Sequence, residues 1–186
     1  VADPESLVVL NWRSRLPQNA SKEWVHVMHG VQGILWPGDK GVMVSGMFPY
    51  AAFETLGREN PVFSTLFGYF NGLSRNLAIR GQAMSASTEY VTGEYFRGLA
   101  VRPAAGRLID SEDDRPGAAP VAVISFATSQ NRFGGPSNAI GQPILVDTTP
   151  FTVIGVAPPE FFGVDPAIAP DLYLPLHTNV LLDGRE

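Results

Sequence analysis

The stretch PVAVISFATSQNRFGG, residues 120–135, says most about the fold. Residues 121–124 are an uninterrupted apolar run, which is typical of a buried strand. Ser125 stands where a helix N-cap is expected, so a helix is predicted from there to Phe133. The Gly-Gly-Pro sequence that follows ends that helix. This stretch therefore predicts a buried strand that leads directly into a helix.

Further strands are predicted on both sides of this stretch. Residues 144–146 and 151–156 indicate two strands around a turn at 147–150, and residues 171–176 indicate another strand. Residues 62–91 are strand-like around a predicted Gly81-Gln82 turn, which fits a hairpin or meander. Strand–helix–strand units mixed with hairpins predict an α+β fold.

The N-terminal part is predicted to hold one strand and one helix. Residues 7–10 form a short apolar run with the pattern of a buried strand. Pro49 stands at the start of a predicted helix that Gly57 or Asn60-Pro61 ends, and residues 93–99 predict one or two helical turns. Residues 11–47 show no sustained period, and we interpret them as an insertion-like excursion with short pieces of structure.

Composition narrows the class of protein. The chain has 186 residues, of which 45% are hydrophobic and 17% charged, so it is long enough for a core in one domain or two small ones. Its net charge of −5 argues against a nucleic-acid binder. Residues 110–186 contain ten of the 18 acidic residues but only three of the 13 basic ones, so the negative charge belongs to the second half of the chain. The absence of cysteine excludes disulfides, thiolate zinc sites and cysteine nucleophiles.

Targeting and nucleotide-binding signals are absent from the sequence. No apolar run reaches the roughly 18–20 residues that span a bilayer, and no signal peptide is present. From its first residue, Val1, and its last, Glu186, we interpret the chain as a piece of a longer protein. The sequence has no phosphate-binding loop, dinucleotide-binding glycine motif, nucleophile elbow or His-Glu-x-x-His helix. We therefore expect neither an ATPase nor a bound cofactor in this domain.

Two groups of side chains have the composition of a metal or catalytic site. His26 and His29 are three residues apart, with Asp39 as a third possible ligand, but an ordinary histidine pair is the favoured interpretation. An acidic cluster suggests a calcium site or a carboxylate pair for acid–base chemistry. A solvated turn, or acids at a helix N-terminus, is favoured instead because calcium-loop spacing is missing. The acidic cluster consists of Asp110, Glu112, Asp113 and Asp114.

Two further groups suggest contacts with a partner. Phe161-Phe162, followed by Gly163-Val164, suggests an exposed apolar contact, although core filling after Pro158-Pro159 is favoured. An arginine trio suggests an anion site, although ordinary salt links are favoured. The trio is Arg97, Arg102 and Arg107.

The order of these pieces is more specific than any one of them. The ordered set comprises residues 91–108, 112–114, 120–125, 132–135, 140–141 and 151–159, with Phe161. It resembles the MacB-type periplasmic core domain, which lies between the first and second membrane helices of FtsX-like ABC transporter permeases. The likeness is greatest to the duplicated orphan permeases of Acidobacteria, and it rests on residues 48–50, 60–63, 165–166 and 170–176. The likeness runs from about Asp3 to Leu182.

The resemblance implies one MacB-like periplasmic core domain over residues 1–186, with a membrane-proximal βαβ-type subdomain and a distal, mostly β subdomain. It implies a non-catalytic domain on the periplasmic side of the bacterial inner membrane, in which ATP hydrolysis on another subunit drives movement. The implied partners are membrane helices of the same chain, a separate ATP-binding subunit, and a periplasmic protein or transported substrate. A homodimer is a further expectation.

The sequence departs from the family pattern in two places. Ser129-Gln130-Asn131 occupies helix positions where the family usually has a tryptophan, so we expect altered packing under this helix. The family also continues with a further strand–helix unit, and we expect the membrane-proximal subdomain to be incomplete, with a sheet edge open to dimer contacts. Two alternatives stay open: a free-standing module that binds a small ligand between subdomains, lined by aromatic residues of 12–70, and an enzyme that uses the acidic cluster.

Overall fold

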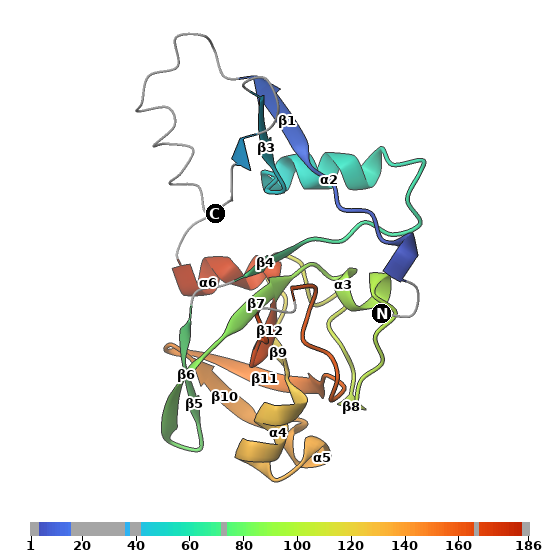
Figure 1. Cartoon of the computed structure of the whole chain (residues 1–186). Helices are drawn as coiled ribbons and strands as arrows, with labels where there is room; N and C mark the ends of the chain where they lie inside the picture. The colour runs from blue at the N-terminus through green and yellow to red at the C-terminus, as the bar shows by residue number, and fades with distance from the viewer. Residues whose placement is uncertain (1–3, 16–35, 38–41, 72–73, 166–167, 184–186) are drawn as a thin grey trace. The chain divides into compact units, whose positions relative to one another are not determined.

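The computed structural model describes residues 4–15, 36–37, 42–71, 74–165 and 168–183 (Figure 1). It divides into two compact units, a small unit of residues 3–62 and a large unit that begins at residue 63 and also takes in residues 1–2. The mixture of one large sheet with short helices confirms the predicted α+β class. No helix of the described residues has the length and apolarity needed to cross a bilayer.

The small unit contains a three-stranded antiparallel sheet and one helix among its described residues. The sheet has the order β1-β3-β2, and the indole of Trp12 in β1 donates a hydrogen bond to the carbonyl oxygen of Met47. Its elements are η1 (Pro4–Ser6), β1 (Trp12–Arg15), β2 (Trp36–Pro37), β3 (Val42–Ser45) and α2 (Tyr50–Arg58). The helix predicted from Pro49 is confirmed as α2, which continues through Gly57 and ends before Asn60-Pro61.

The strand predicted at residues 7–10 is wrong. These residues lie between η1 and β1 and belong to no strand. Val8 and Val9 are 65% and 77% exposed, so the apolar run is not buried in a core. A short apolar run forms a strand only when a neighbouring strand pairs with it, and here pairing begins at Trp12, opposite Ser45.

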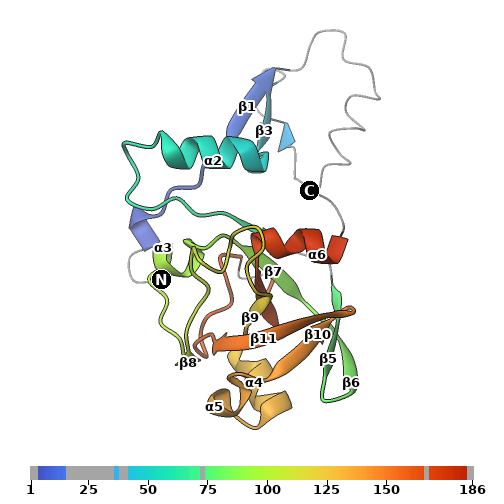
Figure 2. The same ribbon diagram turned by 180° about the vertical axis from the view of Figure 1, so that it is seen from behind.

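The large unit is built on a nine-stranded sheet with the path β4-β7-β12-β9-β11-β10-β5-β6, in which β8 pairs with β11. Figure 2 shows the unit from behind, with α4 and α5 at one end and α6 at the other. The strands are β4 (Tyr69–Asn71), β5 (Arg75–Ile79), β6 (Gln82–Ala86), β7 (Thr88–Val91), β8 (Ala105–Gly106), β9 (Val121–Ile124), β10 (Pro143–Val146), β11 (Thr149–Val156) and β12 (Leu172–Pro175). The helices are α3 (Tyr95–Gly98), α4 (Phe126–Phe133), α5 (Pro136–Ala139), η3 (Leu176–Thr178) and α6 (Asn179–Asp183).

The strand-to-helix stretch folds as predicted. Strand β9 is buried throughout, and the Ser125 hydroxyl caps α4 by accepting a hydrogen bond from the Thr128 amide at 3.1 Å. Gly134 ends α4 in the left-handed conformation, with φ of 75°. At the altered family position, Ser129 is fully buried, and its hydroxyl donates to the Phe126 carbonyl at 2.7 Å. The local capping signals were therefore sufficient to place this helix.

Two hairpins extend the sheet. Strands β10 and β11 meet at a turn that begins with Asp147, which confirms the predicted strand–turn–strand. Strands β5 and β6 also form a hairpin, but the turn is Arg80-Gly81, one residue before the predicted Gly81-Gln82. Both turn residues have positive φ, 49° and 79°, which is the geometry that a two-residue hairpin turn requires.

The large unit has a core on each face of its sheet. One core gathers aliphatic side chains and includes Phe133 of α4 and Ala139 of α5. Neighbouring residues of a strand point to opposite faces, so Tyr90 of β7 joins this core whereas Glu89 points the other way. The second face is packed with aromatic rings and holds the site described next.

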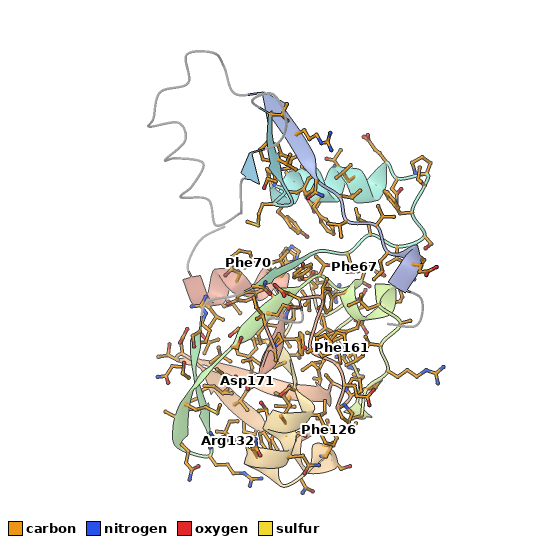
Figure 3. The ribbon with its side chains drawn as sticks, in the orientation of Figure 1. Phe67, Phe70, Phe126, Arg132, Phe161 and Asp171 are labelled. Atoms are coloured by element: carbon orange, nitrogen blue, oxygen red, sulfur yellow. The ribbon has the colours of Figure 1, made fainter. Side chains whose placement is uncertain are left out.

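Asp171 joins three elements of the large unit (Figure 3). Its carboxylate accepts hydrogen bonds from the Ser87 amide at 2.9 Å and from the Thr128 hydroxyl at 3.3 Å. Its backbone carbonyl accepts from the Ser125 amide at 2.9 Å. The start of β12 is thereby fixed to β7 and to the first turn of α4.

Candidate functional site

Six aromatic rings pack on the second face of the large sheet, and we call them the aromatic cluster. Tyr95 lies at its centre, with ring centroids 5.2 to 6.4 Å from the other five rings. Figure 3 marks Phe67 and Phe161, which come from segments far apart in the sequence. The members are Phe67, Tyr69, Tyr95, Phe96, Phe161 and Tyr173. Such tilted and edge-on packing is the favoured arrangement of aromatic side chains.

Glu89 is buried among these rings, with no measurable exposure. In the sheet it lies beside Tyr173 of β12 and opposite Asn71 of β4. The Tyr95 hydroxyl donates a hydrogen bond to Glu89 Oε1. Glu89 Oε2 and the Tyr173 hydroxyl are buried without a hydrogen-bond partner. The site therefore holds a carboxyl group with only one of its two oxygens satisfied.

Burial dominates the electrostatics of the site. It is the main reason that the pKa of Glu89 rises to about 7, with a smaller upward contribution from Asp165 and an opposing one from the Tyr95 hydrogen bond. Burial and then the charge of Glu89 also raise the pKa of Tyr95, Tyr173 and Tyr69. No ion pair joins Glu89 to a basic group in the described part of the chain. Its carboxyl group can therefore gain or lose a proton near neutral pH.

The segment after β11 covers this carboxyl group. Gly163 has φ of 85°, and a Cβ atom there would lie 3.0 Å from Glu89 Oε2. Phe161 of the same segment packs on Phe96 and Tyr173, with ring centroids 5.7 and 5.6 Å apart. Glycine is thus needed at 163 for the chain to pass so close to the carboxyl group.

Sequence reasoning missed Glu89. The residue stands between Thr88 and Tyr90 in the stretch 62–91, for which the sequence predicts strands but no buried charge. The available signal was a charged residue at an inward position of a strand flanked by large side chains. Its neighbours come from residues 67–69, 95–96, 161 and 173, which are far apart in the sequence, so no local pattern indicates the cluster.

In the described residues, the side chains of the acidic cluster make hydrogen bonds and ion pairs within the fold. Asp113 is buried and accepts two hydrogen bonds from Arg107, at 2.5 and 2.8 Å, with another from the Asp110 amide at 3.1 Å. Burial alone would raise the pKa of Asp113, but the hydrogen bonds and charge of Arg107, together with the Asp110 amide, lower it below its usual value. Glu112 is exposed and pairs with Arg115. The favoured interpretation, a solvated turn, is correct for Glu112 but not for the buried Asp113.

Asp114 connects three segments of the large unit. Its Oδ2 accepts from the Gly93 amide at 3.1 Å, and its Oδ1 accepts from the His177 amide at 2.9 Å and lies 3.0 Å from His177 Nδ1. The turn before α3, the acidic turn and η3 are thereby held together. This contact spans 63 residues and carried no local sequence signal.

The remaining candidates do not form a chemical site among the described residues. His26, His29 and Asp39 lie outside the described residues. Within those residues, no group of three or more His, Cys, Asp and Glu side chains is placed to hold a metal ion. The favoured salt links are confirmed for Arg97, which pairs with Glu94, and for Arg107. Core filling is partly correct for Phe161, which is half-buried and packs on Phe96 and Tyr173, whereas Phe162 is 48% exposed.

One protein family matches nearly the whole chain. The family described as "MacB-like periplasmic core domain" matches residues 10–185. Among curated proteins, the chain is 41% identical over 71 residues to the pyoverdine export ATP-binding/permease protein PvdT of Pseudomonas syringae pv. tomato, covering 37% of this chain and 11% of that protein. It is 32% identical over 118 residues to the macrolide export ATP-binding/permease protein MacB 2 of Aeromonas hydrophila, covering 59% and 18%. The chain thus spans less than a fifth of these relatives.

Solved structures share the fold. The periplasmic region of MacB from Actinobacillus actinomycetemcomitans matches with a TM-score of 0.59 at 20% identity, over 75% of this chain and 60% of that one. The extracellular domain of the noncanonic ABC-type transporter YknZ from Gram-positive bacteria matches with a TM-score of 0.60 at 17% identity, over 74% and 67%. At these identities the likeness concerns the fold alone.

Proposed function

Because this chain belongs to the MacB-like periplasmic core domain family, we propose that it is the extracytoplasmic domain of an ABC-type export permease. The single observation that carries this proposal is the family match across residues 10–185, which includes both the strand-to-helix stretch and the acidic turn. In this role the domain contacts a partner protein or a transported substrate and performs no catalysis.

A mechanical role suits the way this chain uses its polar side chains. Asp113 and Asp114 each bind backbone amides, and Asp171 joins β12 to β7 and α4. Such buried charged contacts fix the relative positions of the elements they connect. They support a large unit that moves as one body when the membrane part of the protein is displaced. The driving step is then ATP hydrolysis on a separate subunit or domain.

The proposal also places the domain on the periplasmic side of the inner membrane, connected to membrane helices of the same chain. The described residues contain no membrane-spanning helix, which is compatible with a domain outside the bilayer. The partners proposed are an ATP-binding subunit acting through those helices and a periplasmic protein or transported substrate. A homodimer of the full-length protein is a further part of the proposal.

Labelling of introduced cysteines in whole cells tests this placement, since the chain itself has none. The full-length gene product carries Thr148→Cys, at an exposed turn, or Ala122→Cys, at a fully buried position. A maleimide that cannot cross the inner membrane should label the Thr148→Cys protein in intact cells. The Ala122→Cys protein should react only after denaturation, and the parent without either change sets the background. Labelling of Thr148→Cys only after the inner membrane is broken would refute the placement.

Coupling to ATP hydrolysis needs a second measurement. The rate of labelling at Thr148→Cys is compared in cells with an active ATP-binding subunit and with one that binds ATP but cannot hydrolyse it. Movement of the domain should change this rate, or its crosslinking to a partner, between the two states. Identical rates and crosslinks at several exposed positions would remove the mechanical role but leave the placement intact.

A further inference from the structure

We propose that Glu89 is a proton-operated latch: the 158–165 segment stays packed against the sheet while the carboxyl group is protonated, and loss of the proton releases that segment. The inference goes beyond the proposed transport role and does not depend on it, because it concerns the chain itself.

The 158–165 segment lies close to the carboxyl group of Glu89. Gly163 lies close enough to Glu89 Oε2 that a Cβ atom there would be 3.0 Å away. Phe161 anchors the same segment on Tyr95 and Tyr173, with ring centroids 6.3 and 5.6 Å away. The segment therefore keeps water from the one carboxyl oxygen that has no hydrogen-bond partner.

A negative charge on Glu89 is costly at this buried position. An ionised carboxylate is stable in a protein interior only when donors or a cation compensate for lost water. Glu89 has one donor, the Tyr95 hydroxyl, and the neighbouring carboxylate of Asp165 adds repulsion. Ionisation therefore favours any arrangement in which Oε2 reaches water.

The segment is the part of the surroundings best able to move. Among the described residues, the ionisable groups that interact with Glu89 are Tyr69 on β4, Tyr95 on α3, Tyr173 on β12 and Asp165 on the segment. Strands β4 and β12 are paired in the sheet with β7, so Tyr69 and Tyr173 are held there, and α3 begins four residues after the end of β7. The 158–165 segment contains no strand and no helix. Displacement of this segment therefore disturbs the sheet less than displacement of a strand would. Asp165, which belongs to the segment, repels the ionised carboxylate of Glu89.

Hydrogen exchange of the chain at about pH 5 and about pH 8 tests the latch. Peptides that cover the segment are compared after correction for the intrinsic pH dependence of exchange. With a pKa of about 7 when closed and 4.5 when open, the opening equilibrium should rise on the order of 50-fold or more between these conditions. Peptides from α4 should keep their protection. A segment whose opening changes less than about twofold would overturn the proposal.

Two variants separate the latch from a general effect of pH. Glu89→Gln cannot ionise but keeps an acceptor for Tyr95, so its segment should stay protected at both pH values. Glu112→Gln removes the same charge from an exposed turn and should respond as the unaltered chain does. A pH response retained in Glu89→Gln would overturn the proposal.

The size of the pH response gives a test that survives if Glu89→Gln fails to fold. Tyr95→Phe removes the donor that stabilises the charged carboxylate while the segment is closed, so the rise in opening between the two pH values should be larger than in the unaltered chain. Asp165→Asn removes a neighbouring negative charge, so the rise should be smaller. A rise of the same size in both variants would show that Glu89 does not control the segment.

Discussion

Replacement of Asp114 by alanine should destabilise the large unit more than any other single change in the acidic cluster except one at Asp113. The carboxylate accepts from the amides of Gly93 and His177, at 3.1 and 2.9 Å, and its side chain is only 5% exposed. A hydrogen bond to a charged group contributes about 1.5–3 kcal/mol, and a buried amide left without a partner costs about 1–3 kcal/mol. Since some water can reach the site in the variant, we expect a loss of about 3 kcal/mol.

Urea unfolding followed by far-ultraviolet circular dichroism measures this loss. Glu112→Ala is the matched control, because it removes a carboxylate two residues away whose side chain is 74% exposed, and it should change stability by less than about 0.5 kcal/mol. Asp114→Asn keeps one acceptor oxygen and should fall between the two. A loss of less than about 1 kcal/mol in Asp114→Ala would refute the reasoning that this carboxylate joins the three segments.

Three further predictions concern residues that shape the large unit. Because the pKa of Asp113 is lowered in the folded chain, its pair with Arg107 stabilises the fold fully above pH 3.8, the value for a free carboxyl group. This contribution to stability is lost as the pH falls through the lowered pKa. Asp113→Asn should therefore make the stability of the fold depend less on pH in the acid range, which unfolding measured at a series of pH values tests. Ser125→Ala should cost about 1 kcal/mol by thermal unfolding, because α4 loses its N-cap, whereas Ser137→Ala at an exposed position should be near neutral. Gly155→Ala should give little folded protein in a soluble-expression assay, because its Cβ atom would overlap the backbone carbonyl of Arg107, and normal yield would show that β8 can shift away from β11.

The parts of the fold that were predictable from sequence are those set by local signals. Ser125 and Gly134 mark the ends of α4 through their own capping preferences, and Asp147 follows a strand directly at a turn. The error at residues 7–10 has the opposite cause, since an apolar run becomes a strand only where another strand pairs with it. The turn at Arg80-Gly81 was misplaced by one residue because register is set across the hairpin.

The candidate site was harder to predict than the fold. The electrostatic environment of Glu89 is formed with Tyr95, Tyr173 and Asp165. Asp165 and Tyr173 lie more than 70 residues further along the chain. Asp114 similarly meets His177 across 63 residues. A single sequence gives residue types and local periods but not which distant segments share one face of a sheet. The order of motifs along the chain was enough to predict the family, whereas the site around Glu89 could be identified only from the folded structure.

The division of aromatic residues between the two units has a practical consequence for spectroscopy. All three tryptophans, at positions 12, 24 and 36, belong to the small unit, whereas Tyr90, Tyr95 and Tyr173 are fully buried in the large one. Excitation selective for indole therefore reports on residues 3–62 alone, without any label. Four of the five tyrosines lie in the large unit, so ultraviolet difference absorbance of tyrosine follows mainly that unit in the same sample. One titration can thus show whether the two units unfold together or one after the other.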